Sequence, residues 1–230
     1  MDSPLDNALL AGLPQEDYQS LFRHLKLLRL TQGQVLFDRG DHIEHVYFPT
    51  SALISMVIDL EDGFRAEAVM IGNDQLAGGV ALGGELSCMR AEVRSAGHAY
   101  CLPVEVLYKE FRRGRALMDL VLTGIRQTFV RVAYASICGK RHHSEQQVVR
   151  WILSSADSTR SDEIVATHVQ IAQLIGVRRE AVTLALGKLS GQALIDVSRG
   201  KIALLDRPGM EEHACECYWA IRRQARLRTV

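Results

Sequence analysis

The sequence predicts an α+β protein: an N-terminal antiparallel β-roll of the jelly-roll type, a long helix, and a C-terminal winged helix-turn-helix. Three patterns support this prediction. Short runs rich in Val, Ile, Tyr and Phe fill the first half, a long apolar repeat at helical spacing follows, and two short helical segments around a glycine precede a hairpin. We assign residues 1–115 to the β-roll, 116–139 to the long helix and 140–230 to the winged-helix domain.

The N-terminal half changes its period near residue 34. Apolar residues at helical spacing over about 9–28 predict one or two short helices, and from there to about Leu102 the apolar runs shorten. Turn signals such as Arg39-Gly40-Asp41 and Gly83-Gly84 separate the runs, which favours an antiparallel barrel or jelly roll. The expected strands cover 35–37, 46–48, 53–58, 66–71 and 99–102.

The composition is that of an ordinary globular protein. The 230 residues are 47% hydrophobic, which favours two domains, and neither a membrane-length apolar run nor a basic leader segment is present, so a cytoplasmic location is expected. Five cysteines, an odd number without framework spacing, favour a reducing compartment. Net charge is zero, but 14 Lys and Arg against 10 Asp and Glu from Lys140 onward make the C-terminal part mildly basic.

A long helix is predicted from about Ala116 to Cys138. A helix with so broad an apolar stripe needs a partner, and a second copy of itself would form a homodimer. The alternative is that the stripe packs on its own β-roll. A second helix is expected over 143–155, followed by a polar loop over 154–163. The stripe consists of Leu117, Leu120, Val121, Ile125, Thr128, Phe129, Val132 and Ile137.

Residues 168–189 predict a helix-turn-helix. Ala172 is small enough for two helices to cross closely, and Gly176 accepts the positive φ of a tight turn. Apolar residues occupy the inward positions of both helices. An ordinary helical hairpin would explain the apolar positions but would leave the polar ones unconstrained.

The polar residues of the second helix suit DNA recognition. The helix begins with Arg178, Arg179 and Glu180, with Thr183 following, and recognition helices contact base edges through their N-terminal residues. Arginine can bridge guanine O6 and N7, and glutamate can accept a hydrogen bond from the cytosine amino group. Lys188, farther along, is expected to meet a phosphate.

A β-hairpin wing is predicted over 193–206. Its tip, Ser198-Arg199-Gly200-Lys201, places Arg199 and Lys201 where they could touch backbone phosphates. A charged hairpin tip is also typical of any exposed turn. Together, the helix-turn-helix and the wing favour binding to double-stranded DNA.

The order of parts resembles the Crp/Fnr superfamily of bacterial transcription regulators, which join a cyclic-nucleotide-binding-like β-roll, a dimerisation helix and a winged helix. By this resemblance, Arg179 and Glu180 match the pair that reads a G·C step. Members that read the best-known half-site carry a second arginine where this chain has Leu184, which puts its half-site in doubt. The resemblance rests on residues 33–37, 39–41 and 46–48, on the long helix, and on 176–182 with Leu194-Ile195.

The same resemblance indicates which effectors to exclude. Members that bind cyclic AMP use a Gly-Glu-Leu turn followed by Arg-Ser or Arg-Thr, whereas the matching turn here is Ala77-Gly78-Gly79-Val80 and Arg90 is displaced with no hydroxyl beside it. Gly83-Gly84-Glu85-Leu86 copies the letters but stands too close to Arg90. The iron–sulfur branch needs an N-terminal cysteine cluster, and the first cysteine here is Cys88. The effector stays unknown.

No enzyme, metal site or cofactor is expected. His42 and His45 lack the spacing of a metal-binding cupin, and no nucleophile constellation appears. Cys215 and Cys217, near His213, have no second pair to complete four ligands, so they are interpreted as incidental helix cysteines. Cys88, Cys101 and Cys138 are interpreted as isolated, small core residues, with any redox role left open.

The expected function is sequence-specific DNA binding by a homodimeric transcription regulator, paired through the 116–139 helix. Its expected partners are double-stranded DNA, a second copy of the chain and RNA polymerase, with no membrane partner. The alternative is a ligand- or redox-sensing module whose C-terminal domain binds a protein instead of DNA.

Overall fold

Two antiparallel sheets form the N-terminal β-roll. The computed structural model describes residues 3–79, 86–114 and 116–226. Apolar side chains that alternate along the strands, including Leu30, Phe37, Ile54 and Val93, pack between the sheets. The predicted fold class is confirmed. One sheet has the order β1 (Lys26–Leu30), β7 (Gly97–Pro103), β3 (His45–Pro49), and the other β2 (Val35–Phe37), β6 (Arg90–Ser95), β4 (Leu53–Asp59), β5 (Arg65–Ile71).

Two of these strands depart from the sequence prediction. The predicted N-terminal helical region extended to Leu28, but the chain enters β1 at Lys26 because all five β1 residues pair with β7. This long-range ladder overrides the local helical spacing. Strand β6 was not predicted, although Ala91 and Val93 alternate with charged residues, which is a strand signal. The predicted turn at 83–84 lies outside the described residues.

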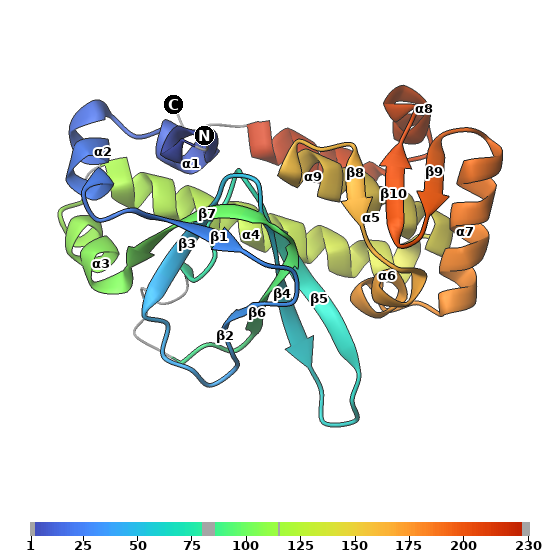
Figure 1. The fold of residues 1–230 in the computed structure, drawn as a ribbon, viewed down its shortest axis with the longest axis horizontal. Helices are drawn as coiled ribbons and strands as arrows, with labels where there is room; N and C mark the ends of the chain where they lie inside the picture. The colour runs from blue at the N-terminus through green and yellow to red at the C-terminus, as the bar shows by residue number, and fades with distance from the viewer. Residues whose placement is uncertain (1–2, 80–85, 115, 227–230) are drawn as a thin grey trace.

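The N-terminal helices and the long helix cover the β3 and β7 side of the roll. Leu117, Leu120 and Val121 of the long helix α4 (Ala116–Arg141) pack there with residues of β3, β7 and the short helices. The predicted long helix is confirmed and runs behind the β-roll toward the winged helix (Figure 1); among the described residues, its buried side chains lie on one face. The short elements are a 3-10 turn η1 (Pro4–Asp6), α1 (Ala8–Ala11), α2 (Gln15–Phe22) and α3 (Val104–Arg112).

Helix α5 (Ser144–Thr159) begins the C-terminal part and is longer than predicted. Residues 154–159 were expected to form a polar loop but continue the helix. Within it Ser155 donates to the Trp151 carbonyl and Thr159 to the Ser155 carbonyl, and Ala156 is buried in the core of the winged helix. The helix ends at Arg160, which has a left-handed φ of 53°. Strand β8 (Glu163–Val165) was not predicted either.

The winged helix follows in chain order. Its core joins buried residues of α5, the two short helices and the small sheet, with the order β8-β10-β9. Among the described residues, no helix has the length and apolar character needed to cross a bilayer. The remaining elements are α6 (His168–Ile175), α7 (Arg179–Gly191), β9 (Ile195–Ser198), β10 (Lys201–Leu204), α8 (Arg207–Glu212) and α9 (Glu216–Arg226).

The β-roll packs directly on α5. Leu53 of β4 and Met70 of β5 belong to the same buried cluster as the winged helix. Gly72, just after β5, permits the closest approach, since a Cβ there would stand 2.4 Å from the Ser158 carbonyl oxygen. Asn73 N–H also donates to that carbonyl at 3.0 Å. The sheet end and α5 are therefore in backbone contact, while α7 lies at the far edge of the molecule (Figure 1).

Candidate nucleic-acid interface

The helix-turn-helix is built from α6, a glycine turn and α7. Thr167 caps α6 in a reciprocal capping box with Gln170, which sets where the helix begins. Gly176 ends α6 with φ of 71°, and Val177 N–H returns to the Ala172 carbonyl at 3.0 Å. The predicted turn at Gly176 is confirmed, and its positive φ is one that glycine adopts readily.

Three predicted contact residues stand at the start of α7. Arg178 is the N-cap, and Arg179 and Glu180 are the first two helical residues; all three are exposed. Within the described ranges, no hydrogen bond or ion pair engages their side chains. No side chain from the described part of the chain caps the helix, so its first N–H groups and its positive dipole end also face outward. This end of α7 can therefore approach a polyanion.

Two other predicted residues of α7 already have partners. Thr183 Oγ1 lies 2.9 Å from Nδ1 of His168, which connects the two helices of the motif. Lys188 Nζ contacts both carboxylate oxygens of Glu145 at 2.9 Å, drawing Lys188 toward α5. The pair is exposed, so exchanging it for a phosphate contact costs little free energy.

Leu184 forms an apolar spot on the outward face of α7. Its side chain is 75% exposed, although it lies between polar contact positions. An exposed leucine gains nothing from water, whereas the thymine methyl group in the major groove offers an apolar partner. Leu184 therefore adds an apolar group to the exposed face of α7.

The wing tip carries one free and one paired basic residue among those described. Arg199 and Gly200 both have positive φ, 39° and 79°, as a two-residue hairpin turn with a matching twist requires. Arg199 is exposed, while Lys201 Nζ pairs with Glu163 of β8 at 2.8 Å. The Gly200 carbonyl accepts from Ala166 N–H at 2.8 Å, tying the tip to the chain just before α6. The wing is thus held at the side of the helix-turn-helix.

In the β-roll, the arginine that resembles a phosphate ligand is engaged elsewhere. Arg90 donates from Nη2 to Asp38 at 2.7 Å and from Nε at 3.0 Å. The hydrogen bond with Arg90 lowers the pKa of the Asp38 carboxyl below its usual range. Because Asp38 neutralises the positive charge of Arg90, that charge is not available to the phosphate of an anionic nucleotide. Val80 and residues 83–85 of the compared turns lie outside the described part of the chain.

A cavity of about 550 Å³ lies where the β-roll meets the winged helix. Its lining includes Glu67 of β5, Arg131 of α4 and Trp151 of α5. Burial raises the pKa of the Glu67 carboxyl, which also accepts hydrogen bonds from Ser55 and Trp151. No local pattern in the sequence marks this site, because its walls come from separate elements.

The structure brings together cysteines that the sequence analysis had separated. Cys138, interpreted as an isolated core residue, is buried but lies beside Cys215 and Cys217, and His142 joins them. Cys101 is buried as expected, whereas Cys88, interpreted in the same way, is exposed. His213, the histidine considered from the sequence, instead faces Glu145 at 4.0 Å. The hydrogen bond between Cys138 and Cys215 lowers the pKa of Cys215 to about 5 and raises the pKa of Cys138. The second pair of side chains with metal-ligating atoms, which the sequence analysis did not find, is Cys138 and His142, one helical turn apart.

Comparisons with known proteins agree with this architecture. Residues 146–213 match the family model described as a Crp-like helix-turn-helix domain. A comparison with curated protein sequences gives no match.

Solved structures with the same fold cover most of the chain. A CRP-family transcriptional regulator from Thermus thermophilus is 21% identical, with a TM-score of 0.66, over 81% of this chain and 96% of that one. FixK2 from Bradyrhizobium japonicum is 13% identical, with a TM-score of 0.69, over 83% and 98%. The c-di-GMP responsive regulator CLP from Xanthomonas campestris is 14% identical, with a TM-score of 0.66, over 83% and 99%. The chain therefore shares the fold of these regulators, and its residues 146–213 match a Crp-like helix-turn-helix domain.

Proposed function

We propose that this chain, a member of the Crp/Fnr superfamily with a Crp-like helix-turn-helix domain, binds specific double-stranded DNA as a homodimer and so regulates transcription. The observation that carries the proposal is the open N-terminus of α7, where Arg178, Arg179 and Glu180 are exposed and unpaired with any described side chain. Inserted into a major groove, these side chains reach base edges, and Arg179 and Glu180 together suit a G·C step.

The wing and the far part of α7 supply backbone contacts. Arg199 is exposed at the wing tip, and Lys188 and Lys201 can exchange their surface carboxylate partners for phosphates. Such contacts position the protein without reading sequence. Glu180 places a negative charge among these cations. This charge repels base edges that present only acceptors, so it favours sequence specificity over general affinity for DNA.

Dimerisation is supported by the second face of α4. While Leu117 and Leu120 are buried in the roll, an apolar stripe on the same helix stays exposed, with Phe129 the most open at 73%. A symmetric copy would bury this stripe against itself and place two α7 helices for half-sites about 34 Å apart. This exposed stripe consists of Leu122, Ile125, Phe129, Val132 and Ile137; of the stripe predicted from the sequence, Leu117, Leu120 and Val121 instead pack on the chain's own roll.

The β-roll is proposed to work without cyclic AMP. Arg90 is neutralised by Asp38, and the described part of the matching turn, Ala77-Gly78-Gly79, offers no carboxylate for a ribose. The regulator is expected to act in the cytoplasm on chromosomal DNA, with RNA polymerase as the partner through which bound protein changes transcription.

Selection of bound sequences from random DNA, with purified protein and no added ligand, tests the proposal. A two-fold symmetric consensus is expected, with an affinity that falls as salt rises because phosphate contacts release counterions. Negligible affinity for every DNA at low salt would refute it and favour a C-terminal domain that binds protein. Calorimetric titration with cyclic AMP is expected to give no binding heat.

A further inference from the structure

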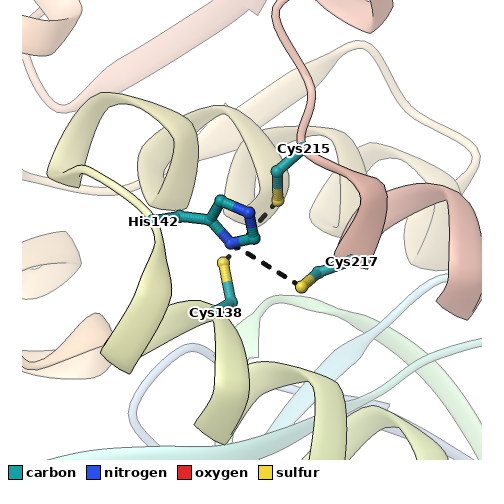
Figure 2. Close-up of side chains that lie close together, drawn as sticks. All are labelled: Cys138, His142, Cys215 and Cys217. Atoms are coloured by element: carbon teal, nitrogen blue, oxygen red, sulfur yellow. Dashed lines mark hydrogen bonds between the residues drawn. The ribbon is translucent and has the colours of Figure 1, made fainter.

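Four metal-ligating side chains meet at the junction between the long helix and the winged helix. Cys138 lies in the last turn of α4 and His142 just after it, while Cys215 precedes α9 and Cys217 lies in its first turn. Figure 2 shows the four side chains pointing toward one another from these two segments. Their ligand atoms all lie within 4.8 Å of one another. The three cysteines are buried.

We propose that Cys138, His142, Cys215 and Cys217 form a tetrahedral Cys3His site for a zinc ion. Zn–S bonds of about 2.3 Å and Zn–N bonds of about 2.0–2.1 Å imply edges of about 3.8 Å between two sulfurs and about 3.6 Å between sulfur and nitrogen. The Cys138 and Cys215 sulfurs are 3.7 Å apart, and Cys217 Sγ lies 3.7 Å from His142 Nδ1. Both measured edges fit a single ion at the centre.

The surroundings of His142 also fit a metal ligand. Its Nδ1 faces the sulfurs, while Nε2 lies 3.0 Å from Oε2 of Glu216. A carboxylate on the outer ring nitrogen is the usual support of a zinc-bound histidine, because it fixes the tautomer and ring orientation. Gln147 donates to the His142 carbonyl at 2.9 Å and so holds the backbone of this ligand as well.

The sulfur side has support of the same kind. Arg150 Nε donates to Cys138 Sγ at 3.3 Å, placing a buried cation beside a thiol that would carry negative charge once it binds metal. Tyr134 packs against the cysteines and completes an apolar cover. Soft thiolates with one imidazole in a closed four-ligand set select zinc over magnesium or calcium.

The position of the site assigns it a role. Cys138 and Cys215 are 77 residues apart in sequence, so an ion bound by both would join the end of α4 to the start of α9. Helix α9 also packs along α4 and against α5. The ion would hold the C-terminal helix α9 against the junction between the long helix and the winged helix. This role does not depend on whether DNA is bound.

Metal analysis of the full-length protein tests this assignment. Protein purified without oxygen, with reductant and supplied zinc, is expected to hold about one zinc ion per chain, as four ligands around one ion require. Cobalt substituted for zinc is expected to give the intense visible absorption of a tetrahedral thiolate site. Cys138→Ser and Cys217→Ser should abolish stoichiometric binding, while Cys88→Ser and His213→Ala, which alter residues outside the four, should retain it.

Glu216→Gln keeps the proposal testable if the cysteine variants fail to fold. This exposed carboxylate supports a ligand without being one, so its loss is expected to weaken zinc affinity 10- to 100-fold in competition with a chelator, with the fold unchanged by circular dichroism. Zinc well below one per chain after addition to reduced protein would overturn the assignment. So would octahedral cobalt spectra, an iron–sulfur cluster, or unchanged affinity in both Glu216→Gln and Cys217→Ser.

Discussion

Trp151 of α5 donates its indole N–H to Oε1 of Glu67 on β5 across 3.2 Å, joining the winged helix to the β-roll. Arg94 of β6 stacks over the same indole, with its guanidinium carbon 4.7 Å from the ring centroid. Glu67 and Trp151 also line the cavity between the two halves. The contact therefore links a strand of the β-roll directly to the first helix of the C-terminal part.

The Glu67 contact predicts a pH dependence of stability. Burial raises the pKa of Glu67 above its ordinary value of 4.5, against the opposing influence of Arg94 and Arg150. Folding thus favours the protonated carboxyl, so its stabilisation is complete below pH 4.5 and is lost as the pH rises through the higher folded pKa. Glu67→Gln, which keeps a neutral acceptor, should unfold at a higher temperature than the parent protein at pH 8.

Thermal unfolding from pH 4.5 to 8 measures this difference. The gap between Glu67→Gln and the parent should widen as the pH rises. The exposed Glu61 provides the matched control, since Glu61→Gln makes the same chemical change outside the interface. A gap that stays constant with pH would show that Glu67 is not held near its neutral form.

Arg179→Ala should lower affinity for the selected site by about 1–3 kcal/mol and relax the base preference at one position. The physical reason is the loss of a bidentate contact to guanine at the open end of α7. Gel-shift titration against matched and mismatched sites measures both effects. Arg23→Ala, at an exposed arginine of the N-terminal half, should change neither; equal discrimination between sites in Arg179→Ala would remove Arg179 from base recognition.

Leu184→Arg should change the half-site itself. The 75% exposed leucine favours a thymine methyl, whereas arginine favours guanine, so sequence selection is expected to show thymine replaced by guanine at one position. Ser190→Arg, also exposed on α7, is the control for added charge. It should strengthen binding to all sequences and steepen the salt dependence, leaving the consensus unchanged. An identical consensus for Leu184→Arg would contradict the docking proposed for α7.

Phe129→Glu should convert the proposed dimer to monomer. A carboxylate at the most open position of the α4 stripe would face its own copy across a two-fold axis, where like charges repel. Analytical ultracentrifugation should show halved mass, and DNA affinity should fall because one half-site contact is lost. Phe22→Glu makes the same change at an exposed phenylalanine of α2 and should leave the assembly intact. If the parent protein is already monomeric at micromolar concentration, the proposed dimer is wrong.

The sequence by itself determined the elements whose signals are local. The long helix, the turn at Gly176 and the hairpin tip at Gly200 follow from periodicity and from glycine's access to positive φ, and the structure confirms all three. The placement of Arg178, Arg179 and Glu180 at one helix end also follows from their adjacency. Their contacts with bases stay a prediction.

Only the tertiary structure decided the elements that depend on distant partners. Strand β1 has helical spacing but forms a ladder with β7, about 70 residues later, because backbone groups beside a sheet edge must be paired. The pairing of Thr183 with His168 and of Lys188 with Glu145 depends on how α7 packs against α6 and α5. Local spacing cannot show such contacts.

The cysteine cluster shows this limit most clearly. Cys215 and Cys217 are too few for a metal site when their own segment is considered alone. The other two ligands, Cys138 and His142, are brought to them by the packing of α9 on α4. A helical turn places Cys138 and His142, four residues apart, on one side, and Cys215 and Cys217 are close in sequence, but only the fold brings the ligand atoms of all four within 4.8 Å of one another.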